Sequence, residues 1–495
     1  MMAQRGKMPE TLVVFNGING STGNYLIPPM TLRELSAYIQ KENLATKNPL
    51  SVLSLKKERD EAGRLGVQDD VDPLSLAQAG WGVIFPAQLD SATLKALKTA
   101  LHPLLNLRKR QAGERYYEYE GSDGYQPDDT ILEWLPRHGM GPGEEGNPAV
   151  VPYYLLLVGS PEMIPFSFQY QLDVNYAVGR LYFEPLNGES FTETLPRYAL
   201  YGQSVASTED DKPFLRRRIT LFGVANDDDQ STQSSHRSLI VPLANELSQK
   251  YGDWDMKVIA KEEATKSQLI HLLGYKEAPS LLFTASHGVG FELGDPKQLR
   301  HQGALLCHDW PGPVVWSLER KGIPEHFYLS ADDVSDTARL LGTIIFHFSC
   351  YGAGTPRFSD SSHIIPPTNK EVIPKDIVAY LPQRLLSHPN GSALAVIGHV
   401  DQVYGYSFRW EQAGKQTGAF RDTMSRLMRG ERVGWATEPL NRRYAALSTS
   451  LSSILQQIRF GRIADDENLA GIWTANNDAR NYVILGDPAV KLPLE

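Results

Sequence analysis

The segments Leu281-Leu282-Phe283-Thr284-Ala285-Ser286-His287-Gly288 and Ile344-Ile345-Phe346-His347-Phe348-Ser349-Cys350 carry the strongest structural signal in the chain. Each begins with a short apolar run, which is typical of a buried strand, and ends in a reactive side chain. Glycine follows closely in both, which lets the backbone approach a bound carbonyl group. Because the carboxyl ends of neighbouring parallel strands meet at one edge of a sheet, we expect His287 and Cys350 to face a shared crevice.

Strands and helices alternate on both sides of these two segments. Further strands are predicted, by short apolar runs, at Trp81–Phe85, Tyr153–Val158, Ile219–Val224, Met256–Ala260, Ala393–Gly398 and Tyr482–Leu485. Residues with helical spacing separate most of them. This alternation predicts an α/β fold with a mostly parallel sheet and helices on both faces.

The chain divides into three predicted parts. Residues 1–77 form a lead-in or small cap with a helical pattern near Thr31–Lys41. Residues 78–205 form a first α/β subdomain, and residues 206–495 form the catalytic subdomain. The polar stretch Ser204–Pro213 is interpreted as the linker between these two subdomains.

Composition excludes several classes of protein. With 495 residues, of which 41% are hydrophobic and 22% charged, the chain is globular rather than disordered or fibrous. Its net charge of −9 argues against nucleic acid or an anionic membrane as the main partner. Since the sequence has no apolar run of about 18 residues and no signal core in Met1–Glu10, we expect a cytoplasmic protein without a membrane span. Two cysteines are too few for a disulfide framework.

Cys350 and His287 together point to nucleophilic catalysis. A cysteine at a strand end is by itself most often a small buried apolar residue, but a thiol nucleophile needs an imidazole to take its proton. The conjunction of both residues at two strand ends favours a catalytic dyad. No Walker-type phosphate loop occurs, no metal site is expected, and the chemistry requires no cofactor. The triplet Asp227-Asp228-Asp229 is interpreted as a solvated turn rather than a calcium site.

The two boxes, Ser286-His287-Gly288 and Ser349-Cys350-Tyr351-Gly352-Ala353-Gly354, resemble those of caspase-like cysteine peptidases of the caspase-hemoglobinase fold. This group includes bacterial caspase-like proteins, CHAT-domain proteases and gingipains. The resemblance extends to Tyr482–Ala489 and, towards the N-terminus, to Tyr154–Gly159 and Asp173–Arg180, so that it covers about residues 80–495. Ser349 departs from metacaspase-like chains, which have aspartate before the nucleophile.

The resemblance implies roles for individual residues. Cys350 is expected to be the nucleophile, His287 the base and later the acid, and the N–H groups of Gly288 and Cys350 the oxyanion hole. In gingipains an acidic residue that assists the histidine comes eleven positions before an aspartate at the base of the primary specificity pocket. Glu162 and Asp173 have this spacing. Glu162 is therefore expected to assist His287, and Asp173 to bind substrate.

Together these points predict a cysteine endopeptidase that cleaves protein substrates after Arg or Lys. Bacterial relatives often serve in defence, so the resemblance also implies a place in antiviral defence or cell-death signalling. Two alternatives stay open, namely a caspase-like scaffold without catalysis and a cysteine transpeptidase. Basic loops, among them Arg216–Arg218, predict an activating cleavage or self-processing around residues 206–218.

Overall fold

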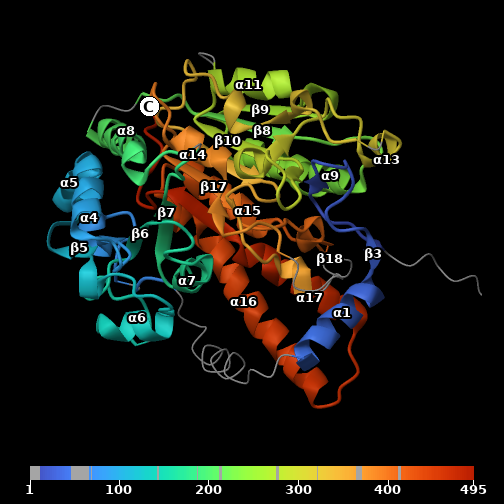
Figure 1. Cartoon of the computed structure of the whole chain (residues 1–495), viewed down its shortest axis with the longest axis horizontal. Helices are drawn as coiled ribbons and strands as arrows, with labels where there is room; N and C mark the ends of the chain where they lie inside the picture. The colour runs from blue at the N-terminus through green and yellow to red at the C-terminus, as the bar shows by residue number, and fades with distance from the viewer. Residues whose placement is uncertain are drawn as a thin grey trace, which may run out of the picture.

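A ten-stranded sheet forms the centre of the computed structural model (Figure 1). The structure describes residues 12–45, 66–68, 70–141, 144–186, 188–210, 214–274, 278–319, 321–363, 371–410 and 414–495. In order across the sheet, the strands are β5 (Tyr116–Tyr119), β4 (Trp81–Ile84), β6 (Tyr154–Val158), β7 (Ala177–Leu181), β20 (Tyr482–Gly486), β17 (Ala395–His399), β14 (Ile344–Phe348), β10 (Leu281–Ala285), β8 (Arg218–Gly223) and β9 (Asp255–Ala260).

The direction of the strands divides this sheet into two blocks. Every neighbouring pair is parallel except β17 and β20, which pair antiparallel. The first block runs from β5 to β20 and the second block from β17 to β9. The first block takes its last strand from the C-terminus, because β20 pairs parallel with β7. The predicted α/β class with a mostly parallel sheet is confirmed.

Helices cover both faces of the first block. Along β4, Trp81 and Val83 belong to the main hydrophobic core, whereas Ile84 belongs to a second core, as alternation along a strand requires. The main core includes side chains of α4 (Ser91–Ala100), α5 (His102–Ala112) and α8 (Phe191–Asp210). The second core includes side chains of α6 (Ile131–Arg137) and α7 (Phe166–Leu172).

Further helices and small sheets complete the described part of the chain. The helices are α9 (Gln230–Ser235), α10 (Val241–Lys250), α11 (Lys266–Gly274), α14 (Tyr380–Leu386), α15 (Gly418–Met428), α16 (Val433–Arg459) and α17 (Asp466–Arg480), with the short α3 (Leu76–Ala79), α12 (Gln298–His301) and α13 (Pro313–Ser317). The remaining short strands are β1 (Leu12–Val13), β3 (Met30–Thr31), β12 (Ala304–Leu306), β13 (Tyr328–Leu329), β15 (Gly354–Thr355), β16 (Ile377–Val378), β18 (Arg409–Trp410) and β19 (Gly414–Lys415). Among the helices of the described ranges, none combines the length and the apolar character needed to cross a membrane.

Residues 12–45 of the predicted lead-in are built into the second block. Its helix α1 (Leu32–Ala45) packs beside α16 and α17 (Figure 1), and Phe15 and Leu35 share a core with Trp473. Its strand β2 (Ile18–Asn19) pairs parallel with β11 (Gly288–Gly290), the strand that follows His287. Residues 1–11 and 46–65 of the lead-in lie outside the described residues.

The predicted linker Ser204–Pro213 is wrong for most of its length. Helix α8 continues to Asp210, because Val205 and Thr208 are buried and give this polar stretch an inward-facing side. Residues 211–213 lie outside the described residues, as does that part of the predicted cleavage region 206–218.

Candidate active site

His287 and Cys350 lie at the carboxyl ends of two adjacent parallel strands. Ala285 of β10 pairs with Phe348 of β14, so each reactive residue comes two positions after the last pair. The N–H of Ser286 donates to the carbonyl of Phe348 at 3.2 Å and extends the ladder towards the site. At Gly288, a Cβ atom would come within 1.8 Å of the Cys350 carbonyl oxygen, so only glycine permits this close approach.

The His287 imidazole is buried and both of its nitrogen atoms have partners. Nε2 lies 2.6 Å from Oδ2 of Asp229, and Nδ1 lies 2.9 Å from the backbone nitrogen of Gly17. An N–H group can only donate, so Nδ1 is unprotonated and accepts from Gly17. The ring proton is therefore on Nε2 and is donated to Asp229, which leaves Nδ1 as the basic nitrogen.

Asp229 is the carboxylate that holds His287. It is fully buried after the carboxyl end of β8 and caps α9, where it accepts the N–H of Ser231 at 3.1 Å. It also accepts the hydroxyl of Tyr25 at 2.5 Å and that of Thr232 at 2.6 Å. Burial alone raises the pKa of Asp229, but His287 and the two hydroxyl groups outweigh burial and lower it to about 2. Asp229 therefore stays ionised beside the imidazole.

The Cys350 thiol has no exposed surface. The N–H of Val403, which follows β17, donates to its Sγ atom at 3.2 Å, and the N–H of Gly288 interacts with the same sulfur. Burial raises the pKa of the Cys350 thiol well above its usual range and outweighs these two N–H groups. The thiol is therefore protonated in this state, with two backbone donors in place for a thiolate.

Gly17 lies against both reactive groups. Its N–H donates to His287, and a Cβ atom on it would come 3.1 Å from Sγ of Cys350 and 2.7 Å from Leu26. Its φ of 100° is also one that side chains rarely adopt. A glycine from the lead-in thus occupies the space beside the thiol and the base.

Glu162 does not assist His287 in this structure. Its carboxylate faces Nζ of Lys375 at 3.5 Å and half of its side chain is exposed. The imidazole nitrogen that an acid would hold is bonded to Asp229 instead. The prediction that Glu162 assists His287 is therefore wrong. Asp229 is closer because it follows β8, the strand beside β10, whereas Glu162 follows β6 in the other block.

Asp173 is buried at the end of α7 and lines only a small enclosed void. Its carboxylate accepts the N–H of Val178 at 3.0 Å, and burial raises its pKa well above the usual range. The void beside it measures about 10 Å³, which is too small for an arginine or lysine side chain. The structure thus places Asp173 in the core, where it anchors the start of β7.

The sequence patterns do not single out four residues that the structure places at the site, namely Asp229, Gly17, Tyr25 and Val403. Asp229 belongs to the triplet that was interpreted as a solvated turn; its neighbour Asp228 accepts the N–H of Val315 at 2.8 Å, and only Asp227 is exposed. A usable signal was present, since an aspartate followed by Ser231 and Thr232 after a strand is typical of a buried helix cap. No comparable signal marks Gly17 or Val403, because both act through the backbone.

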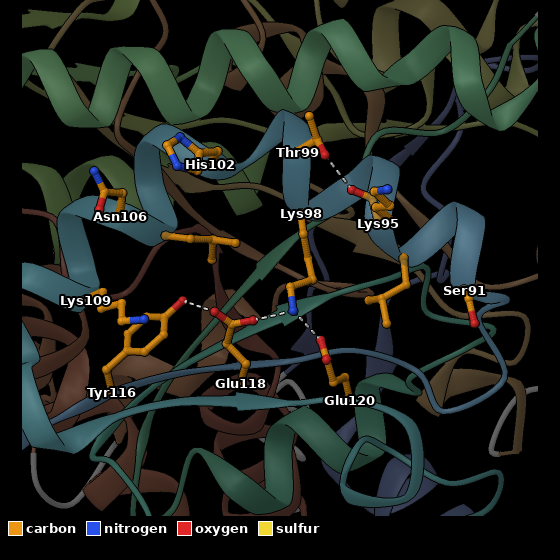
Figure 2. A pocket seen from close by; sticks show the side chains of 12 residues that line it. Ser91, Lys95, Lys98, Thr99, His102, Asn106, Lys109, Tyr116, Glu118 and Glu120 are labelled. Atoms are coloured by element: carbon orange, nitrogen blue, oxygen red, sulfur yellow. Dashed lines mark hydrogen bonds and ion pairs between the residues drawn. The ribbon is translucent and has the colours of Figure 1, made fainter.

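Two open cavities differ in their distance from the dyad. The larger, about 650 Å³, lies between α4, α5 and β5, where Lys98 bridges Glu118 and Glu120 (Figure 2). β5 is an edge strand and lies six strands from β14, so this cavity is remote from Cys350. The smaller, about 330 Å³, adjoins the nucleophile loop, since its lining residue Asp401 accepts the N–H of Tyr351 at 2.7 Å through its backbone carbonyl.

Comparison with known proteins finds similar structures but no related sequence. No protein-family model matches the chain, and no curated protein matches it. Gingipain R, described as an Arg-specific cysteine proteinase, is similar with a TM-score of 0.48 and 12% identity over 86% of this chain and 80% of that one. A structure described only as a protease is similar with a TM-score of 0.46 and 13% identity over 84% of this chain and 78% of that one. The complex of the pro- and mature domains of RgpB from Porphyromonas gingivalis is similar with a TM-score of 0.43 and 12% identity over 83% of this chain and 79% of that one.

Proposed function

We propose that this chain is a cysteine peptidase with Cys350 as its nucleophile and His287 as its base. The observation that carries the proposal is the orientation of the imidazole. Asp229 holds Nε2–H, so that the basic Nδ1 faces the side of the ring where Gly17 adjoins the thiol. A nucleophile, a base and a group that orients the base are the elements of covalent acyl transfer.

The reaction begins when Nδ1 of His287 is free of Gly17. Nδ1 takes the proton of the thiol, and the N–H groups of Val403 and Gly288 stabilise the thiolate. The sulfur attacks the scissile carbonyl carbon, and the resulting tetrahedral oxyanion is held by backbone N–H groups, for which Gly288 and Cys350 remain the predicted donors. His287 then gives its proton to the leaving amine, and a thioester remains on Cys350.

Hydrolysis of the thioester completes the cycle. His287 takes a proton from water, hydroxide adds to the thioester carbonyl, and the thiolate leaves and recovers the proton from the imidazolium. Asp229 stays ionised throughout, because its pKa is lowered to about 2, and it stabilises the imidazolium formed in each half of the cycle.

The cavity beside the nucleophile loop supports a preference for Arg or Lys at the residue before the cleaved bond. Its walls include the rings of Phe166, Tyr170 and Phe358, and three carboxylates line it, those of Asp360, Asp376 and Asp401. Asp360 is paired with Arg480, and Asp401 accepts the hydroxyl of Ser359. Asp376 forms no ion pair with any described residue and accepts the N–H of Arg357. We therefore propose Asp376, in place of Asp173, as the carboxylate that binds a cationic side chain.

The catalytic assignment is tested by three alanine variants of the full chain. Cys350→Ala and His287→Ala should each abolish hydrolysis of a quenched fluorescent peptide library. Thermal unfolding checks that each variant is folded, because His287→Ala leaves Asp229 buried without its imidazole partner. Cys307→Ala is the matched control, because Cys307 is also buried but its thiol interacts with the backbone of Leu305 and Leu329 rather than with an imidazole. Hydrolysis by purified Cys350→Ala at the wild-type rate would overturn the proposal.

The specificity assignment is tested by comparing two aspartates. Asp376→Asn should lower the ratio of kcat/KM for an arginyl substrate over its citrulline analogue by about 10- to 100-fold, because a partly desolvated ion pair is lost. Asp173→Asn should leave this ratio unchanged, whatever its effect on stability. Equal loss of preference in both variants would contradict the role of Asp376. A place in a bacterial defence cascade stays a prediction from the sequence resemblance.

A further inference from the structure

The lead-in covers the catalytic dyad with one short segment, residues Phe15–Ile27, which we call the strap. Gly17 bonds Nδ1 of His287 and lies against the Cys350 sulfur, as described above. The ring of Tyr25 meets the imidazole edge-on, with 6.0 Å between ring centres, and its hydroxyl donates to Asp229. With the strap in place, His287 and Cys350 are 1% and 0% exposed. No peptide bond reaches the thiol in this state.

The strap binds as a peptide would. Its strand β2 adds to the edge of β11 immediately after His287, with Ile18 opposite Val289 and Asn19 opposite Gly290. The N–H of Gly20 donates to the carbonyl of Gly290 at 2.7 Å and extends this pairing. Extended peptides commonly bind by adding a strand to an exposed sheet edge. The strap therefore occupies the sheet edge nearest to the dyad.

The strap nevertheless does not offer a peptide carbonyl for attack by Cys350. The carbonyl of Gly17 accepts the N–H of Leu26 at 3.0 Å, so this oxygen is engaged within the strap rather than in an oxyanion site. The N–H of Gly17 in turn uses the lone pair of Nδ1 that would take the proton of the thiol. Gly17 also lies against the sulfur of Cys350, whose burial raises the pKa of the thiol. The strap therefore covers the thiol, occupies the basic nitrogen of His287 and packs against the sulfur of Cys350.

We propose that the strap is an autoinhibitory element, and that a peptide substrate binds along β11 only after the strap has left this edge. The proposal rests on the peptidase function proposed above, because it concerns the regulation of the same site. Activity then depends on the fraction of molecules in which the strap is open. A change that weakens the strap at a distance from the dyad should raise this fraction without altering the chemistry.

Ser21 provides such a remote attachment. Its hydroxyl donates to Oδ2 of Asp295 at 2.8 Å, in the turn of the strap that follows β2. Neither residue contacts His287 or Cys350. Losing this hydrogen bond should raise the open fraction about fivefold, which is the effect expected for one partly buried hydrogen bond. Ser317→Ala is the matched control, since the Ser317 hydroxyl donates only to Val314 within its own helix.

The readout is the rate at which iodoacetamide alkylates Cys350, mapped by peptide mass spectrometry on the full chain, with Cys307 as the internal reference. Ser21→Ala should speed alkylation of Cys350 about fivefold and leave that of Cys307 unchanged. The double variant Ile18→Cys with Val289→Cys gives the opposite change, because these residues pair across the two strands. Its oxidised form should alkylate at Cys350 at least about tenfold more slowly than its reduced form.

Peptide hydrolysis measured on the same samples separates the two proposals. If Cys350 responds to Ser21→Ala and to the disulfide lock but no form hydrolyses peptides, the strap is a cover and the peptidase proposal fails. If peptides are hydrolysed at the same rate with the lock oxidised and reduced, the strap proposal fails and the peptidase stands. Hydrolysis that rises in Ser21→Ala and stops on oxidation, in step with alkylation, supports both. A synthetic peptide of residues 14–27 should then inhibit Ser21→Ala competitively.

Discussion

The two blocks of the sheet each bury a charged network, but the two networks have different partners. In the second block, Asp229 is bonded to the imidazole of His287. In the first block, Asp487 after β20 and Glu209 on α8 are bonded to the guanidinium of Arg108, which is fully buried. An imidazole can take and release a proton near neutral pH, whereas a guanidinium stays protonated. The Asp229–His287 pair is therefore suited to proton transfer, whereas the Arg108 network joins α5 to α8 and to the end of β20.

The largest effect is expected at Asp229. Asp229→Asn should lower kcat by about 10³- to 10⁴-fold, because the amide neither stabilises the imidazolium nor enforces the tautomer with Nδ1 unprotonated. Steady-state kinetics with an arginyl peptide measures this loss. Glu162→Gln is the control and should keep kcat within about twofold, as expected for an exposed side chain. Comparable losses in the two variants would restore Glu162 as the assisting acid.

The next largest effect is expected at Arg108, on stability rather than on chemistry. Arg108→Met leaves Asp487 and Glu209 buried without their cation, which should lower the free energy of unfolding by about 3–5 kcal/mol. Lys98→Met, which breaks the partly exposed pairs with Glu118 and Glu120 (Figure 2), should cost less than about 1 kcal/mol. Urea denaturation of both variants tests the contrast. The account of the first block fails if the two losses are equal.

The smallest effect over a single pH unit is expected from Asp401, which lies beside the loop that carries Cys350. Burial and the neighbouring Asp360 raise the pKa of Asp401 to about 7 in the folded chain, well above its unfolded value. The folded state therefore holds this proton more tightly, and the stability gained from it is lost as the pH rises from about 4 to 7, by at most about 1.4 kcal/mol per pH unit. Asp401→Asn should flatten this part of the pH dependence of unfolding. Parallel curves for the variant and the wild type would show that Asp401 does not titrate in this window.

Much of the sheet follows from local patterns in the sequence. The apolar runs at Leu281–Ala285 and Ile344–Phe348 are buried on both faces, and such strands stand out as continuous hydrophobic segments. The neighbouring positions of His287 and Cys350 followed from strand direction and from the two glycine-rich boxes. β7 and β5 were not predicted, because Gly179 and Arg180 interrupt the apolar pattern of β7 and tyrosines with a glutamate form β5.

What the sequence did not disclose depends on contacts between distant segments. Asp229 lies 58 positions before His287, and only the pairing of β8 with β10 brings it to the imidazole. Gly17 lies 270 positions before His287 and reaches it because α1 is packed beside α17 at the other end of the chain. Neither contact leaves a local pattern, since one uses an ordinary helix-capping aspartate and the other a backbone N–H.

The central claim is that Cys350 forms a covalent bond with the substrate under the control of His287. The direct measurement is intact and peptide mass spectrometry after acid quench of the Ser21→Ala chain mixed with an activated arginyl ester. We expect a mass increase equal to the acyl group, located on Cys350, that is absent from Cys350→Ala and strongly reduced when His287→Ala is added to the Ser21→Ala chain. Turnover of the ester without an adduct on Cys350, or with the acyl group on another residue, would contradict it.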